Sequence, residues 1–221
     1  MSSIFTSSIG KKFLMSLAGL FLITFLLVHM GINLLVILYD DPMVYNKAAH
    51  FMSTNILIKV FEIILFGGLL LHIIFALILQ VQNWLARPRR YSKPTKSETS
   101  LFSKWMIHTA IIILIFIIIH MANFYFKAKF GHAPEIVSDG VHYHDLATLV
   151  KEKFLIPGFV IFYILSFVFL GFHLLHGFQS AFKTLGINNR KYTPAIMTLS
   201  IIYTIVVVGG FTAIPLVIYF N

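Results

Sequence analysis

The chain has 221 residues, of which 58% are hydrophobic and 11% are charged, and its formal net charge is +9. Soluble domains have a more even balance of apolar and charged residues, so this composition argues against a water-soluble protein. Cysteine is absent, which excludes disulfides, thiolate-bound iron–sulfur clusters and thioether-attached cofactors in this chain. The basic residues gather at the ends of apolar runs and form no stripe with exposed aromatics, so we expect no nucleic-acid partner.

Five apolar segments reach the roughly 20 residues that a helix needs to cross a bilayer. They lie at about 13–38, 56–83, 103–126, 154–182 and 193–220. Backbone groups in lipid find no water, so each segment is predicted to be helical, and residues 1–221 are predicted to form one all-α membrane domain. The first segment follows Lys11 and Lys12 as a signal peptide would. It is too long for one and lacks a small-residue cleavage site, so we expect a retained helix.

The distribution of basic residues predicts the orientation of the bundle. With the N-terminus inside, the inner segments hold eleven basic residues and one acid, and the outer segments hold six basic residues and seven acids. We therefore expect the N-terminus inside and the C-terminus outside. The inner basic residues are Lys11, Lys12, Arg87, Arg89, Arg90, Lys93, Lys96, Lys104, Lys183, Arg190 and Lys191.

The connections between the spans carry their own signals. Asp41 followed by Pro42 is typical of a helix start, which predicts a short outer helix over 42–53. Pro157 is tolerated near the start of the fourth span for the same reason. The long polar stretch 127–152 is predicted to cap the outer end of the bundle, and 85–104 forms a basic inner loop.

Four spans each carry a histidine, and ionisable side chains inside membrane helices are functional candidates by default. At 1.5 Å per residue, His29 and His120 both lie roughly 25 Å from the inner boundary, whereas His72 and His173 lie near 15 Å. Two opposed imidazoles at one height are what a six-coordinate heme iron requires. A lone zinc or iron ion would need three or four converging ligands, and the only acid within a span is Glu62. The alternative is that each histidine only hydrogen-bonds a neighbouring helix.

Other histidines are weaker candidates. His176 lies three residues after His173 and is an alternative ligand on nearly the same face. His108, near the inner end of the third span, is expected to pack or to touch a heme propionate. The outer loop contains residues of the types that bind metals, namely His132, His142 and His144 with Asp145. Without a fourth fixed ligand, we expect them to be ordinary surface residues.

Several stretches resemble a known family. The run Ser16-Leu17-Ala18-Gly19-Leu20-Phe21-Leu22, continuing to Leu27-Val28-His29-Met30 and Asn33, is similar to the first helix of a di-heme cytochrome b. That protein is the type B membrane anchor of succinate:quinone oxidoreductases, which comprise succinate dehydrogenases and fumarate reductases. Further matches are Ala48-Ala49-His50-Phe51-Met52, His72, His120 and the Phe172-His173, Gly177-Phe178 and Ser180 pattern.

The resemblance implies two b-type hemes, a distal one on His29 and His120 and a proximal one on His72 and His173. It also implies two partners on the inner face of the cytoplasmic membrane: a flavoprotein with FAD, where succinate is oxidised in the tricarboxylic acid cycle, and an iron–sulfur subunit. Electrons then pass through both hemes to a quinone, commonly menaquinone. Some fumarate reductases carry a glutamate two residues before the fourth ligand. That place is Gly171 here, which favours succinate oxidation as the direction.

Quinone reduction needs a proton donor or acceptor near the outer heme. His50 is the first candidate and Glu62 the second, although either is also explained as an ordinary residue at the membrane edge. Two other functions stay open. One is a cytochrome b subunit of a hydrogenase or formate dehydrogenase, and the other is a transporter that uses the histidines along its pathway.

Overall fold

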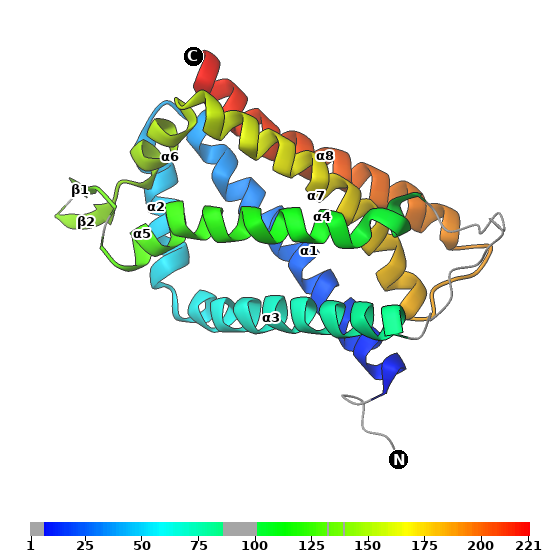
Figure 1. Cartoon of the computed structure of the whole chain (residues 1–221). Coiled ribbons are helices and arrows are strands. Elements are labelled where there is room, and N and C mark those ends of the chain that lie inside the picture. Colours follow the sequence, from blue (N-terminus) through cyan, green and yellow to red (C-terminus); the bar gives the residue numbers. More distant parts are fainter. Residues whose placement is uncertain (1–6, 86–100, 132, 139) are drawn as a thin grey trace.

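The computed structural model describes residues 7–85, 101–131, 133–138 and 140–221, and it is mostly helical (Figure 1). Five helical segments are long and apolar enough to cross a membrane, which indicates a multi-pass membrane protein and confirms the predicted five-helix bundle. They are α1 (Ser8–Leu38), α3 (Ile56–Leu85), the segment Trp105–Lys129 that begins within α4 (Leu101–His120), α7 (Pro157–Thr184) and α8 (Thr193–Phe220).

The spanning helices differ from the predicted ranges mainly at their ends. The first helix begins before the two lysines because the Ser7 hydroxyl caps it, accepting a hydrogen bond from the backbone N–H of Gly10 at 3.0 Å. The fourth span was expected from residue 154, but it begins at Pro157, because Ile156 is extended. Proline at the first helical position needs no hydrogen-bond acceptor for its nitrogen.

The third span continues beyond α4 through a turn of π-helix, η1 (Met121–Tyr125), into α5 (Phe126–Lys129). A π-turn inserts one residue into the helical repeat and is frequent at functional sites. Here it directly follows His120, so the side chains after the turn are rotated relative to those before it. The predicted end of this span at residue 126 therefore lies within a continuous helical segment that ends at Lys129.

Short elements gather at one end of the bundle, which we call the hairpin end (Figure 1). They are α2 (Pro42–Thr54), α5, the antiparallel strands β1 (Glu135–Ser138) and β2 (Val141–His144), and α6 (Leu146–Phe154). The surface helix predicted over 42–53 is confirmed, and Asp41 caps it by accepting from the Met43 N–H at 2.9 Å. The hairpin and α6 fill the stretch expected to be a cap. Gly140 turns the hairpin with a φ of +76°, a value that glycine adopts without strain.

Helices α1, α7 and α8 pack on one another, α4 lies against α7, and α3 lies against α1 (Figure 1). Their shared core includes Phe167 and Leu170 of α7 and Val207 and Phe211 of α8. Large apolar side chains on the outer faces are more than half exposed, as lipid-facing side chains are expected to be. Examples are Ile63 at 74%, Ile118 at 60% and Ile205 at 66%.

A buried polar residue, Asn46 of α2, joins two of the short elements to each other. Its side chain, in a residue that is 1% exposed, donates to Asp145 Oδ1 and accepts from the backbone N–H of Ala147, both at 2.9 Å. Asp145 in turn caps α6 by accepting from the N–H of Thr148. Because these bonds join residues about a hundred positions apart, they fix the cap onto α2.

The first spanning helix begins and the last one ends at opposite ends of the bundle (Figure 1). The hairpin end therefore corresponds to the side predicted to be outside. Which side faces the cytoplasm stays a prediction from the basic residues. Six of the eleven inner basic residues, Arg87, Arg89, Arg90, Lys93, Lys96 and Lys104, lie outside the part of the chain whose side chains are described.

Candidate functional site

The four mid-span histidines lie in two pairs of neighbouring rings. His29 of α1 and His120 at the end of α4 form the pair nearer the hairpin end, with ring centroids 5.8 Å apart and planes at 86°. Phe211 packs against His29 at 5.8 Å, and Phe116 stacks on His120 at 5.6 Å. The surroundings of this pair are thus mainly aromatic and apolar.

His72 of α3 and His173 of α7 form the second pair, with ring centroids 6.3 Å apart and planes at 68°. Gly19 of α1 lies beside it, and a Cβ added there would stand 3.4 Å from Cε1 of His72. The missing side chain lets α1 pass close to this ring. The structure therefore brings together the same two pairs that the depth argument groups.

In the second pair, both Nδ1 atoms face an oxygen that accepts. Nδ1 of His72 lies 3.3 Å from the carbonyl oxygen of Met15, which has no proton to give. Nδ1 of His173 lies 3.4 Å from Oγ1 of Thr109, whose single hydroxyl proton is donated to the Met106 carbonyl at 2.9 Å. These contacts favour the neutral tautomer with its proton on Nδ1, which leaves the lone pair on Nε2.

In the first pair the partners are different. Nδ1 of His120 lies 3.3 Å from the hydroxyl of Tyr163, a group that donates or accepts. Nδ1 of His29 lies 3.3 Å from Nδ2 of Asn33, which also donates to the His29 carbonyl at 2.8 Å. Tyr45 of α2 donates to Oδ1 of the same asparagine at 3.2 Å, and burial raises the pKa of Tyr45 to about 12, so it stays protonated. His29 is thus linked to the surface helix.

The donor set suits an iron held by two imidazoles. In each pair two rings face each other, with centroids 5.8 and 6.3 Å apart. Ordinary edge-to-face rings have similar spacings, so the Nδ1 contacts carry more weight than the distance. Within the described residues, the hydrogen bonds of all four rings involve Nδ1. Metal-bound histidines donate their second N–H to an acceptor, and an oxygen lies behind Nδ1 of His72, His173 and His120. The contact of His29 is of the other kind, because Nδ2 of Asn33 is a donor.

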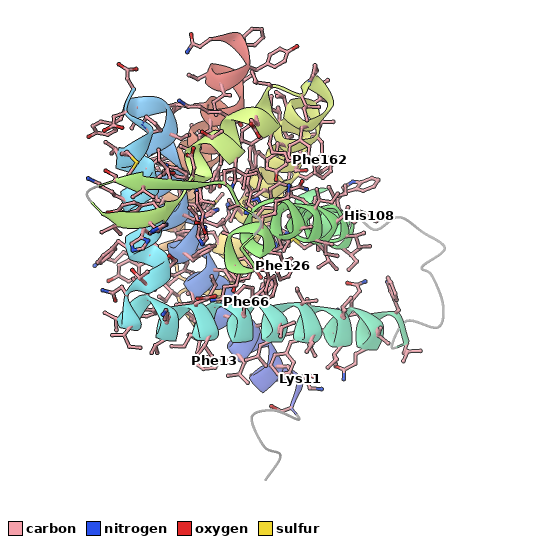
Figure 2. The ribbon with its side chains drawn as sticks, turned by 90° about the vertical axis from the view of Figure 1, so that its left-hand side faces the viewer. Lys11, Phe13, Phe66, His108, Phe126 and Phe162 are labelled. Atoms are coloured by element: carbon pink, nitrogen blue, oxygen red, sulfur yellow. The ribbon has the colours of Figure 1, made fainter. Side chains whose placement is uncertain are left out.

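The remaining histidines of the spans lie elsewhere. His108 is exposed on the outside of α4, where its ring lies 5.0 Å from that of Trp105 (Figure 2). His176 is one turn from His173, and it is His173 whose ring faces His72. Among the described residues, no three His, Asp or Glu side chains come together as a metal site.

His50 lies in a half-open pocket of about 240 Å³ between α2 and the hairpin. The ring of Tyr143 packs against it with centroids 4.9 Å apart. Nδ1 of His144 is buried and has no hydrogen-bond partner in the described part of the chain. The full lining is His50, Ser53, Thr54, Glu135, His142, Tyr143 and His144. A small polar group with its own donors or acceptors fits this pocket chemically.

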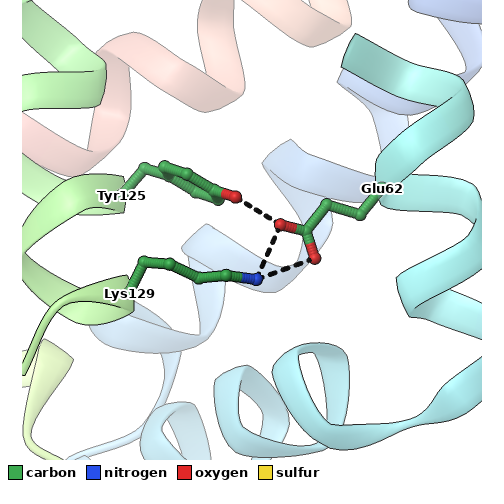
Figure 3. Close-up of polar contacts among 3 residues, drawn as sticks. All are labelled: Glu62, Tyr125 and Lys129. Carbon is green, nitrogen blue, oxygen red and sulfur yellow. Dashed lines mark hydrogen bonds and ion pairs between the residues drawn. The ribbon is translucent and has the colours of Figure 1, made fainter. Parts of the chain in front are cut away.

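Glu62 of α3 is already engaged, as Figure 3 shows. It accepts a hydrogen bond from the hydroxyl of Tyr125, and Nζ of Lys129 lies 3.0 Å from one of its oxygens and 3.4 Å from the other. Tyr125 is the last residue of the π-turn, and Phe66 packs on its ring at 5.3 Å. This cluster joins the hairpin ends of the second and third spans.

The histidine group of the outer loop is dispersed. His142 is 3.8 Å from a carboxylate oxygen of Glu135, and the carboxylate of Asp145 is used by Asn46 and by the start of α6. His132 is outside the described residues. Three polar partners of the mid-span histidines carry no sequence signal, because they come from distant parts of the chain: Thr109, Tyr163 and Met15. Asn33 is four residues from His29 and belongs to the stretch that resembles the family.

No protein-family model, no curated protein and no solved structure matches this chain.

Proposed function

We propose that this chain is the di-heme cytochrome b anchor of a succinate:quinone oxidoreductase in the cytoplasmic membrane. It passes electrons from an iron–sulfur subunit to a quinone, while succinate is oxidised on a partner flavoprotein that holds FAD. The observation that carries the heme assignment is the pairing of the four histidines, three of which, His72, His120 and His173, have an oxygen against Nδ1 and no described hydrogen bond to Nε2. The family assignment rests on the sequence resemblance.

His29 and His120 would hold the heme nearer the hairpin end, and His72 and His173 the other. When bound, a heme would supply one-electron transfer, and iron held by two histidines would transfer electrons without binding oxygen. The histidines would hold the iron through Nε2 and set the orientation of their rings. Phe211 and Phe116 pack against the rings of His29 and His120.

Gly171 supports succinate oxidation without a carboxylate-based proton path through the fourth span. A Cβ at this position would stand 3.2 Å from Cγ2 of Val208 and 3.5 Å from Cγ2 of Thr204, both on α8. A glutamate at position 171 would therefore place its Cβ directly against α8. The close approach of α7 and α8 leaves little room for a side chain at this position.

The quinone headgroup has two candidate binding places at the hairpin end. The pocket at His50 is the first, because it offers imidazole and hydroxyl groups and Nδ1 of His144, which has no partner among the described residues. A quinone oxygen needs such a donor when it is reduced. Glu62 is the second, since its carboxylate and the Tyr125 hydroxyl are within one hydrogen bond of each other. We expect His50→Gln to slow quinone reduction and to alter its pH profile, whereas an unchanged profile would remove His50 from the mechanism.

The iron–sulfur subunit would dock on the end opposite the hairpin. The described basic residues there are Lys11, Lys12, Lys183, Arg190 and Lys191. Arg87, Arg89 and Arg90 belong to the same predicted face and lie outside the described residues. Neutralising these three arginines is expected to weaken assembly of the complex, because charge pairs steer such docking. Full assembly of the triple variant would count against this surface.

A reduced-minus-oxidised spectrum of the purified full-length chain tests the heme assignment directly. We expect two b-type hemes per chain, and we expect His120→Ala and His173→Ala each to lose one of them. His108→Ala and His176→Ala are matched controls that should keep both. A colourless chain, or two hemes retained in both ligand variants, would refute the assignment.

Co-purification separates the remaining choices of partner. Isolation of the chain from its native membrane with a succinate-oxidising flavoprotein supports the proposed complex. Isolation with a hydrogenase or a formate dehydrogenase would instead support the alternative cytochrome b. Neither outcome affects the heme assignment, which is tested on the chain alone.

A further inference from the structure

Two buried hydroxyl side chains stand behind the candidate ligands, one for each histidine pair. Thr109 of α4 is 6% exposed and contacts His173, and Tyr163 of α7 is 2% exposed and contacts His120. Neither residue belongs to the resemblance described above. Both contacts join α4 and α7. Thr109 reaches from α4 to a histidine of α7, and Tyr163 reaches from α7 to a histidine of α4.

The direction of the Thr109 contact follows from proton counting. Its hydroxyl has one proton, and that proton is donated to the carbonyl of Met106 at 2.9 Å. The oxygen is then an acceptor toward Nδ1 of His173, 3.4 Å away. This arrangement selects the tautomer in which Nε2 is free to bind a metal.

The Tyr163 contact is held in place by packing. Six phenylalanines surround its ring at centroid distances between 4.9 and 6.3 Å, namely Phe116, Phe124, Phe154, Phe159, Phe162 and Phe167. The ring therefore has little freedom to move its hydroxyl away from His120. If Nε2 of His120 binds iron, the proton of the neutral imidazole is on Nδ1, and the Tyr163 oxygen accepts it.

We propose that Thr109 and Tyr163 are positioning residues, each of which fixes the tautomer and orientation of one iron ligand. Thr109 acts on the heme at His72 and His173, and Tyr163 acts on the heme at His29 and His120. The proposal rests on the proposed function, because it requires hemes at both pairs. An acceptor behind Nδ1 makes the imidazole more basic, which favours the ferric state of the iron.

The other two ligands differ in kind. Nδ1 of His72 faces a backbone carbonyl, that of Met15, which no side-chain substitution removes. Nδ1 of His29 faces the amide nitrogen of Asn33. Thr109 and Tyr163 are thus the two places where a single hydroxyl can be deleted while the shape of the side chain is kept.

The test is a potentiometric titration of the full-length chain, followed by the absorbance of each heme, in Thr109→Val and Tyr163→Phe. We expect Thr109→Val to raise the midpoint potential of one heme and Tyr163→Phe to raise that of the other. Where heme affinity is measurable, we expect a fall of about 10- to 100-fold at the affected site only. Thr109→Ser, which retains the acceptor, should restore the wild-type values.

Thr204→Val is the matched control, since Thr204 is a buried threonine whose hydroxyl has no partner among the described residues. It should leave both potentials unchanged. Two hemes with unchanged potentials in both Thr109→Val and Tyr163→Phe would overturn this inference and leave the proposed function standing. Equal shifts of both hemes in either variant, or the same shift in Thr204→Val, would also overturn it. A wild-type chain without heme would instead refute the proposed function itself.

Discussion

Replacing Asn46 with alanine is predicted to release the cap at the hairpin end. Asn46 joins α2 to the start of α6 by two hydrogen bonds, one to Asp145 and one from the N–H of Ala147. Alanine removes both, and it leaves the buried N–H of Ala147 without its acceptor. Ala147 is itself fully buried, so water does not easily replace the lost oxygen.

The size of the effect follows from the two bonds. A hydrogen bond to a charged carboxylate contributes roughly 1.5–3 kcal/mol, and an unsatisfied buried N–H costs roughly 1–3 kcal/mol. With partial relaxation, Asn46→Ala is expected to destabilise the docked cap by about 3 kcal/mol. That corresponds to a rise of more than 100-fold in the population of the opened cap, since each 1.4 kcal/mol is a factor of ten.

Limited proteolysis of the purified chain in lipid nanodiscs measures this opening. We expect Asn46→Ala to be cut faster within the hairpin and α6, with the spanning helices intact. Asn55→Ala is the matched control, because Asn55 makes only local bonds to the N–H groups of Leu57 and Ile58 at the start of α3. Equal cleavage of the two variants would refute the idea that Asn46 holds the cap.

The same cluster predicts how the cap depends on pH. Burial of Asp145 raises its pKa, but the hydrogen bonds from Asn46 and Thr148 outweigh it, and the pKa lies below its ordinary value. A carboxylate with a lowered pKa in the folded state stabilises that state above its unfolded pKa of about 4, and the contribution is lost as the pH falls through the folded value. Proteolysis of the cap in the wild-type chain should therefore increase only below about pH 4. In Asp145→Asn this acid-dependent increase should be absent, and an unchanged profile would contradict the assignment.

Two further substitutions test packing and charge at named contacts. A Cβ at Gly210 would overlap the thioether of Met30, so Gly210→Ala should lower the free energy of unfolding by about 1–3 kcal/mol. A Cβ at Gly209 would meet nothing within 4 Å, so Gly209→Ala should not lower it. Equal melting temperatures in detergent would speak against tight packing of α8 on α1. Lys129→Met should cost less than about 1 kcal/mol, because the Lys129 side chain is 49% exposed beside Glu62. A larger loss in the same melting assay would mean that this ion pair is shielded from solvent.

Some features of this protein follow from sequence alone because they are local. Length and hydropathy identify five spanning helices, since a lipid environment leaves a long apolar segment no alternative to a helix. Asp41 and Pro42 mark the surface helix, because capping depends on neighbours within one turn. The common depth of His29 and His120 also follows from counting residues along a helix of fixed rise.

Other features required the tertiary structure because they join residues that are distant in the chain. The facing of His72 toward His173 depends on how α3 and α7 are rotated, which a nearly uniform apolar helix does not encode in its periodicity. The same is true of the hydroxyls of Thr109 and Tyr163, which are 64 and 43 residues away from the histidines they contact. Depth along a helix is a property of the chain, whereas the direction in which a buried side chain points is decided by the packing of its neighbours.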